Sequence, residues 1–298
     1  MSDGLVWVPT QTAVLGSDHH YPEEAPARDV TVDGFAMMTH QVTNAQFAEF
    51  VTATGYLTVA ERPLNPADYP GAPPENLHPG SMVFHRTAGP VDLKHLSQWW
   101  TWTPGACWNH PRGPRSGLRN RDDHPVVHVA FEDAQAYADW AGLALPTEAE
   151  WEVAARGGLP HATYTWGDEP EKPGQRLANY WHGEFPYLPE TGYGQTAAVG
   201  SFPPNGYGLF DMAGNVWEWT ADRSSATYYT YSPKCNPKGP ETGDSKVVRG
   251  GSFNSSAGAL RITNRVWLHP KNKVFPKVTT YGQIINEVFN YIGFRCAQ

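Results

Sequence analysis

The sequence predicts an irregular α+β domain that is poor in regular secondary structure. Only three short segments carry helix-capping signals, and the remaining apolar stretches are brief and separated by turn residues. The 29 glycines and 27 prolines are spread along the chain instead of marking a linker, so we expect a single domain over residues 1–298. Aromatic residues make up 13% of the chain and include 12 tryptophans, which predicts a core built largely from flat rings.

The first third of the chain is expected to hold short strands and one helix. Residues 6–15 and 29–35 alternate apolar and polar side chains around turn signals, a pattern typical of strands. A helix should follow Thr43, which forms a capping box with Gln46, and should end at Gly55. Its expected buried face consists of Phe47, Phe50 and Val51.

The middle of the chain combines a long irregular segment with two more helices. Residues 61–117 show no sustained period, so we expect a segment ordered by aromatic packing. Val126–Val129 is predicted to be a buried strand, and Phe131–Ala141 a helix that ends at Gly142. A third helix should start at Thr147, and strands and loops of a mostly antiparallel sheet should follow it.

Charge and composition exclude several classes of partner. The chain has 22 basic and 30 acidic residues, a net charge of -8, and no long basic stripe, so nucleic acid is not an expected partner. The N-terminal residues resemble no signal peptide, and no window approaches the ~18 consecutive apolar residues of a membrane span. We therefore expect a cytoplasmic protein with no membrane partner. Three scattered cysteines predict neither a disulfide framework nor a CxxC metal site.

The segment Gly208–Thr220 has the residue types of a site for a hard cation. Asp211 and Glu218 are its only acids, and they bracket Gly214 and Val216, whose carbonyl groups are free to turn inward. Calcium takes oxygen ligands from carboxylates and carbonyls, which favours a calcium site here. The alternative is that Asp211 caps a turn and Glu218 points to solvent.

Many segments of this chain, in order, resemble the formylglycine-generating enzyme (sulfatase-modifying factor) family. They include FPPNGYGLFDMAGNVWEWT at residues 202–220, HPVVHVAFEDAQAYADWAG at 124–142, LPTEAEWEVAARGG at 145–158, VVRGGSF at 247–253 and the terminal GFRC. The resemblance extends over nearly the whole length and is specific because of the number and order of its pieces. It implies an irregular fold related to C-type lectin-like domains.

One part of the family pattern is missing. Family members that act as oxidases hold Cu(I) between two cysteines that follow the GGS turn, and soft thiolates suit this ion. Aligned from Ser252, these positions hold Ser255 and Leu260. The resemblance therefore identifies a divergent member, for which we expect neither a Cu(I) dithiolate site nor formylglycine generation.

The resemblance also implies two structural calcium sites. The first consists of the carboxylates of Asp211 and Glu218 with the carbonyls of Gly214 and Val216. The second matches in part: the residues that correspond are Asn179 and the carbonyls of Tyr180 and Tyr193. Thr191 stands where an aspartate would coordinate the second ion.

A ligand pocket is expected where the family has its substrate groove. The predicted lining residues are Trp108, Trp217, Ser252, Ser255, Arg261 and Arg265. Indole walls would supply apolar area, and the two arginines, four residues apart, would form a clamp for a carboxylate, phosphate or acidic peptide. The alternative is that Arg265 supports the fold through a carbonyl or an acid.

The histidines and Cys107 leave further alternatives open. His124 and His128 have a spacing of four, but the expected strand would keep them apart, so we interpret them as structural. The other candidates for an iron or copper site are the scattered His85, His95, His110, His182 and His269. Cys107 is either a thiol of the pocket or a small buried residue.

Two functions follow from these residues. The first is a tailoring oxidoreductase that acts on a small molecule or peptide, anionic ones included, without the cysteine pair. The second is a non-catalytic, calcium-stabilised binding protein of the same fold.

Overall fold

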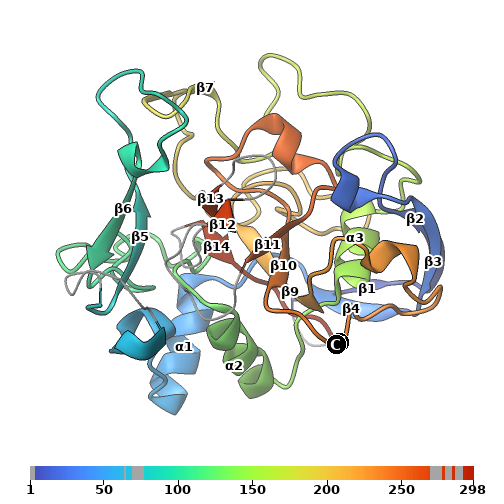
Figure 1. The fold of residues 1–298 in the computed structure, drawn as a ribbon, viewed down its shortest axis with the longest axis horizontal. Helices are drawn as coiled ribbons and strands as arrows, with labels where there is room; N and C mark the ends of the chain where they lie inside the picture. The colour runs from blue at the N-terminus through green and yellow to red at the C-terminus, as the bar shows by residue number, and fades with distance from the viewer. Residues whose placement is uncertain (1–3, 64, 69–76, 269–276, 279–283, 286–290) are drawn as a thin grey trace.

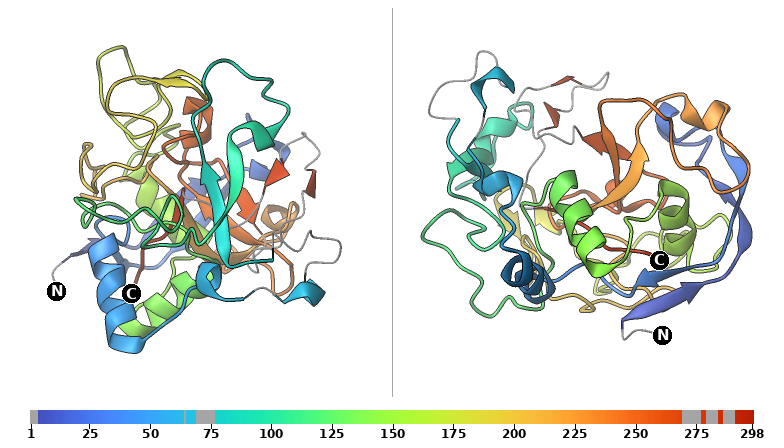
Figure 2. Two further views of the ribbon diagram at one scale, coloured as in Figure 1. Left: turned by 90° about the vertical axis from the view of Figure 1, so that its left-hand side faces the viewer. Right: turned by 90° about the horizontal axis from the view of Figure 1, so that it is seen from below.

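A computed structural model describes residues 4–63, 65–68, 77–268, 277–278, 284–285 and 291–298 of the chain. It shows an irregular α+β fold with short strands in several small sheets and three α-helices among the described residues, as predicted (Figure 1). The C-terminus lies in the lower right part of Figure 1, and Figure 2 shows two further views of the same fold.

The N-terminal strands form two antiparallel pairs. β1 (Leu5–Val8) pairs with β4 (Phe35–Met38), and β2 (Gln11–Leu15) pairs with β3 (Arg28–Val32). The two predicted strand regions are confirmed, although the first contains two strands with a break between them. Both strand pairs pack against α3, so residues 5–38 close one side of the molecule.

The three helices begin and end where their capping residues predict. α1 (Asn44–Thr54) has the Thr43–Gln46 capping box and a left-handed Gly55 at its C-cap. α2 (Phe131–Ala141) ends at Gly142, which has the same left-handed conformation. α3 (Glu148–Arg156) repeats the capping box through Thr147 and Glu150. Local bonding at the helix ends therefore sets all three boundaries.

The helices pack in two different ways. α1 and α2 lie side by side at the lower edge of Figure 1 and bury an aromatic cluster that includes Phe47, Phe50 and Tyr137. Val51, which was expected in this face, is only partly buried. α3 lies between the N-terminal strands and the central sheet, and every one of its residues except Glu150 is buried.

The central sheet has the strand order β11–β10–β9–β14. β9 (Trp217–Arg223) pairs antiparallel with β10 (Lys246–Arg249), which pairs antiparallel with β11 (Val266–Leu268). β14 (Ile292–Gly293) runs parallel to β9, so the sheet is mostly antiparallel, as expected. β9 contains the last four residues of the Gly208–Thr220 segment and places them in the core, because six of its seven residues are at least partly buried.

Two regions differ from their prediction. The segment 61–117 contains a hairpin of β5 (Gly80–Phe84) and β6 (Trp100–Pro104), which stands at the left edge of Figure 1. Val126–Val129 is buried but is not a strand, because His128 has a φ of 59°, outside the extended region.

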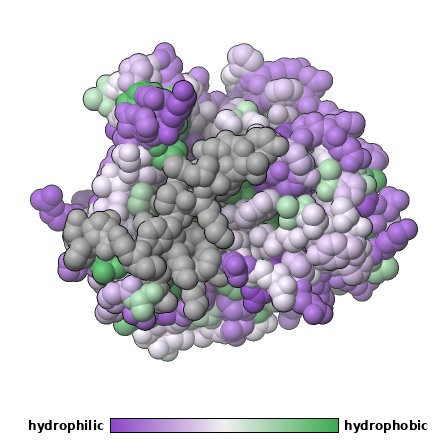
Figure 3. Space-filling view, in the orientation of Figure 1, coloured by the Kyte–Doolittle hydropathy of each residue, from purple (hydrophilic) through white to green (hydrophobic). Residues whose placement is uncertain are grey.

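The remaining described elements are short. The two-residue strands β7 (Gly183–Glu184) and β8 (Leu188–Pro189) pair with each other, as do β12 (Lys277–Val278) and β13 (Ile284–Ile285). None of the described helices is long and apolar enough to cross a membrane. The coloured part of the face shown in Figure 3 is mostly hydrophilic, with small and separate hydrophobic areas.

Candidate functional site

A cavity beside the loop that follows the GGS turn has aromatic walls, and we call it the aromatic cavity. Its volume is about 740 Å³, which suits a small molecule or a short peptide segment. Its walls come from the β5–β6 hairpin, the 180–185 loop, the central sheet and the loop after β10. The aromatic lining residues are Trp99, Trp100, Tyr180, Trp181, Phe185, Trp217 and Tyr291.

The loop after β10 places Ser255 at the wall of this cavity. The Ser255 hydroxyl accepts a hydrogen bond from the backbone N–H of Ser252 at 3.0 Å and lies 3.0 Å from the Ser252 hydroxyl. Ser252 also donates to the side-chain oxygen of Asn254 at 2.7 Å. The carbonyl of Ser255 accepts the N–H of Trp181 at 3.0 Å, which fixes the loop against the opposite wall. Ser252 itself is fully buried and is not among the described residues that line the cavity, although it was predicted to line the pocket.

The position of the second copper cysteine is occupied by a buried apolar side chain. Leu260 is 1% exposed and packs in an apolar cluster with Tyr164, Ala178 and Ala213. None of the three cysteines lines the aromatic cavity as described. A hydroxyl and a leucine are not ligands for Cu(I), so this donor set does not fit the ion.

The predicted indoles have different places. Trp217 lines the aromatic cavity from β9. Trp108 is buried in the core, with its ring 5.3 Å from that of Phe47 between centroids, and it is not among the described residues that line this cavity. The expectation for Trp108 needs correction, because packing against α1 draws the indole inward.

The predicted arginine clamp also needs correction. Arg261 makes a two-pronged ion pair with the fully buried Glu24, with both N–O distances 2.7 Å. Arg265 is bound in the same way by Glu148, and its Nη1 donates to the carbonyl of Glu23. Neither guanidinium faces the aromatic cavity, so both arginines support the fold, which was the alternative considered for Arg265.

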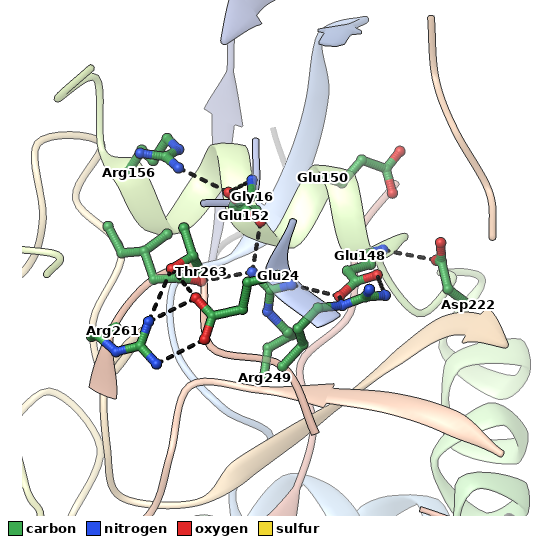
Figure 4. A network of polar contacts seen from close by, with 12 residues as sticks. Gly16, Glu24, Glu148, Glu150, Glu152, Arg156, Asp222, Arg249, Arg261 and Thr263 are labelled. Carbon is green, nitrogen blue, oxygen red and sulfur yellow. Dashed lines mark hydrogen bonds and ion pairs between the residues drawn. The ribbon is translucent and has the colours of Figure 1, made fainter. Parts of the chain in front are cut away.

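These arginines belong to a buried network centred on α3 (Figure 4). Arg249 donates to Glu148, to Glu152 at 2.7 Å and to the carbonyl of Ile262. Glu152 also accepts from Arg156 and from the N–H of Gly16. Burial by itself would raise the pKa of Glu152, but the charges of Arg249 and Arg156 outweigh it and lower this pKa to about 2.

Asp222 lies at the edge of the same network, and its pKa is shifted in the opposite direction to that of Glu152. Its carboxylate accepts the N–H of Glu148 at 2.8 Å, and no described cation forms an ion pair with it. Burial, and then the negative charge of Glu148, raise the pKa of Asp222 to about 8. The raised pKa favours the protonated form of this carboxyl group in the folded protein.

Three oxygens of the first expected calcium site, those of Gly214, Val216 and Glu218, converge on the side-chain nitrogen of Gln41, and Asp211 contributes its backbone carbonyl there instead of the expected carboxylate. Gln41 Nε2 is within 2.9 to 3.4 Å of the carbonyls of Asp211, Gly214 and Val216 and of a carboxylate oxygen of Glu218. An amide NH₂ has two hydrogens, so it cannot satisfy four acceptors. We call these four oxygens the oxygen ring.

Two further side-chain oxygens in the same residues lack hydrogen-bond partners and could bind a cation. Gln41 Oε1 and Asp211 Oδ1 are buried, and neither has a hydrogen-bond partner among the described residues. Burial raises the pKa of Asp211 to about 6. The oxygen and nitrogen of a glutamine amide exchange places by a half turn, which would bring Oε1 toward the ring.

The residues that would hold calcium are therefore Asp211, Gly214, Val216, Glu218 and Gln41. Glu218 has other partners as well, because it accepts hydrogen bonds from Arg295 and from the indole of Trp151.

The second expected calcium site is less complete. Asn179 Oδ1 is buried with no hydrogen-bond partner in the described part of the chain, while its Nδ2 donates to the carbonyl of Gln195 and to Asn215. The rings of Tyr180 and Tyr193 both lie 3.9 Å from that of His182, measured between centroids. Thr191 contributes its carbonyl to Arg176 and offers no carboxylate.

The histidines do not form a metal cluster among the described residues, and no group of three or more His, Cys, Asp or Glu does so there. His128 is hydrogen-bonded to the Ser81 hydroxyl and to the carbonyl of Pro111, which confirms its structural interpretation. Burial lowers its pKa to about 4. His269 lies outside the described residues. Cys107 is buried, and its Sγ lies 3.0 Å from the side-chain oxygen of Asn109.

The fold and the GGS loop define the class of the protein as a domain of the formylglycine-generating type. The model of the sulfatase-modifying factor enzyme 1-like domain matches residues 1–277, and the chain belongs to this family. It is 59% identical to the formylglycine-generating enzyme of Mycobacterium tuberculosis over 218 residues, 72% of this chain and 73% of that protein.

One further relative shares sequence over almost the whole chain, and one solved structure shares the fold. The inactive C-alpha-formylglycine-generating enzyme 2 of Mus musculus is 38% identical over 98% of this chain and 85% of its own length. The solved structure of PvdO from Pseudomonas aeruginosa superposes with a TM-score of 0.64 at 24% identity, covering 98% of this chain and 93% of that one. This structural likeness supports the fold alone.

Proposed function

We propose that this member of the family binds a small molecule or a peptide segment in the aromatic cavity and does not generate formylglycine. The observation that carries the proposal is the pair of positions after the GGS turn. Ser255 faces the cavity and Leu260 is buried among apolar side chains. A binding surface is thus present without a donor set for copper. The relative named inactive supports the existence of such members.

The negative half of the proposal is tested with copper and with peptide. The purified protein should not compete with a chromogenic Cu(I) chelator at the affinity of a dithiolate. It should also leave the cysteine of a CxPxR peptide unchanged in mass. Tight Cu(I) binding, or a mass change in the peptide, would contradict the proposal.

The positive half is tested with an apolar fluorescent probe such as anilinonaphthalene sulfonate. Trp217→Ala should weaken probe binding several-fold, because the indole forms part of the cavity wall. Trp140→Ala is the matched control, since this tryptophan is 42% exposed on α2 and is not among the described residues that line the cavity. Equal probe binding by both variants and by the parent protein would contradict a binding role for the cavity.

A catalytic function is the second candidate, and one pair of residues favours it. Tyr180 is a lining residue of the cavity, and its hydroxyl interacts with Glu171, whose side chain is 2% exposed. Glu171 Oε2 lies 3.6 Å from His182 Nε2. A cavity wall with a coupled hydroxyl and carboxyl group can exchange a proton with a bound molecule, as a tailoring oxidoreductase requires.

The catalytic candidate is tested by substrate screening. Cell extract incubated with the protein should show oxygen consumption or a mass change of one component. Tyr180→Phe should reduce the rate while the melting temperature stays within ~2 °C, the shift that about 1 kcal/mol produces in a chain of this size. A screen in which neither oxygen nor any mass changes leaves binding as the function.

Structural calcium is the third part of the proposal. The support is the convergence of the oxygen ring and the two unpaired oxygens beside it in the described chain. Metal analysis of protein prepared in calcium should find one tightly held ion per chain. A second ion, at Asn179 and the carbonyls of Tyr180 and Tyr193, should bind more weakly because Thr191 adds no charge.

A further inference from the structure

A second cavity, next to the aromatic cavity, collects basic side chains. Its volume is about 460 Å³, and its lining includes His85, Arg86, Arg112 and Arg121 but no acidic residue in the described part of the chain. We call it the arginine cavity. Phe84 lines it and makes ring contacts at 5.5 to 5.7 Å with Trp100 and Trp181 of the aromatic cavity. The two cavities are therefore neighbours across Phe84.

Two of these guanidinium groups are directed at one neutral atom. Gln195 Oε1 accepts from Arg121 Nη2 at 3.0 Å and from Arg112 Nη2 at 3.4 Å. Arg121 also donates to the hydroxyl of Thr196. Both positive charges thus share the oxygen of an amide, and no carboxylate within the described chain forms an ion pair with either of them.

The electrostatic environment of the cavity is positive. Burial, and then the charge of Arg112, lower the pKa of Arg121, and the same two causes lower the pKa of His85. Asp122 and Asp123 follow Arg121 in the chain, but neither lines the cavity as described. The N–H of Ala45, in the first turn of α1, donates to the carbonyl of Asp122, so this N–H is not available to a bound anion.

This arrangement differs from that of the buried arginines of the protein. Arg249, Arg261, Arg265 and Arg295 each have a glutamate partner. The chain carries a net charge of -8, yet three arginines gather around one concave surface without such a partner in the described residues. At the inner wall, Asn44 is 4% exposed, and its Oδ1 has no hydrogen-bond partner among those residues.

We propose that the arginine cavity binds a small oxyanion with at least two negative charges, held between Arg112 and Arg121 with Arg86 at the rim. Guanidinium groups pair with phosphate and carboxylate oxygens in a two-pronged geometry. Two neighbouring guanidinium groups therefore favour an anion with two charges over an anion with one. A phosphate group and a dicarboxylate share this chemistry. The volume admits either one together with a small organic part.

The test is calorimetric titration of the intact protein with inorganic phosphate, succinate and acetate at constant ionic strength. Phosphate or succinate should bind with one site per chain, and acetate at least ~10-fold more weakly because it offers a single charge to two guanidinium groups. Preference between the first two identifies phosphate or carboxylate as the natural group. Absence of saturable binding to either at millimolar concentration would overturn the proposal.

Matched variants locate the site. Arg112→Gln removes an exposed guanidinium from the cavity and should weaken binding at least ~10-fold without a change in melting temperature. Arg121→Gln should have the same effect on binding, with circular dichroism as the check on folding. Arg119→Gln is the control, because Arg119 is exposed in the same segment but does not line the cavity as described. An equal loss in Arg112→Gln and Arg119→Gln would show general charge attraction and refute a built site.

Discussion

Replacing Gln41 should make the protein dependent on calcium. In the absence of the ion, Gln41 Nε2 supplies the hydrogens for the oxygen ring, and its two N–H groups can satisfy two of the four oxygens. Gln41→Met keeps the approximate length of the side chain and removes both donors. Each buried acceptor that loses its partner costs about 1–3 kcal/mol, so the metal-free variant should lose roughly 2–6 kcal/mol.

The assay is thermal unfolding of both proteins in chelator and in excess calcium. At ~2 °C per kcal/mol for a chain of this size, the metal-free variant should melt about 4–12 °C below the metal-free parent. The difference should narrow sharply in excess calcium, because the ion then fills the oxygen ring of both proteins, whereas without the ion only the variant lacks the amide hydrogens. Gln135→Met is the control, since Gln135 bonds to Asp139 on the exposed face of α2.

The reasoning would be refuted by one of two results. If chelator changes the melting temperature of parent and variant by the same amount, the amide does not act in place of the ion. If neither protein retains calcium and Gln41→Met unfolds at the temperature of the parent, the oxygen ring needs no positive partner besides Arg295.

Two further predictions concern buried charges. Arg261→Met should destabilise the protein by about 3–5 kcal/mol, because Glu24 is left buried and unpaired. Binding of the apolar probe to the aromatic cavity of the folded variant should not change. Loss of probe binding with unchanged stability would support the predicted arginine clamp instead. Asp222 has a folded-state pKa raised to about 8, so the folded protein binds a proton that the unfolded chain has released, and stability should fall as pH rises from ~4 to ~8. Asp222→Asn keeps the acceptor for the N–H of Glu148, and its unfolding temperature should fall less between about pH 6 and pH 9 than that of the parent; parallel curves would contradict the raised pKa.

The sequence predicted those features that depend on neighbouring residues. Thr43 and Gln46 are three positions apart, and Gly55 needs only its own backbone freedom, so α1 could be placed to the residue. The β5–β6 hairpin was missed because residues 85–99 separate its strands and no short turn marks it. The run Val126–Val129 has the composition of a strand, but His128 makes two side-chain hydrogen bonds that hold it in a left-handed conformation.

The candidate sites show the same limit at longer range. Trp217 and Ser255 could be placed at the cavity because they belong to segments shared with the family. The partner of Arg261 is Glu24, 237 positions away, and one sequence does not show such a pairing. The arginines at 112, 115, 119 and 121 were visible as residues, but they lie in a segment without periodicity, so no common face was expected for them.

The ion pair between Glu24 and Arg261 ties an early turn to the loop after β10, and this sets practical limits on how the gene can be cut. A fragment that starts at β3 would keep every strand of the central sheet and the three α-helices, yet it would lose the Glu24 carboxylate and the carbonyl of Glu23 that Arg265 uses. In such a fragment the guanidinium group of Arg261 would be buried without its carboxylate partner. Affinity tags and fusion partners should therefore be attached before Leu5 or after Gln298. The domain should not be shortened at either end.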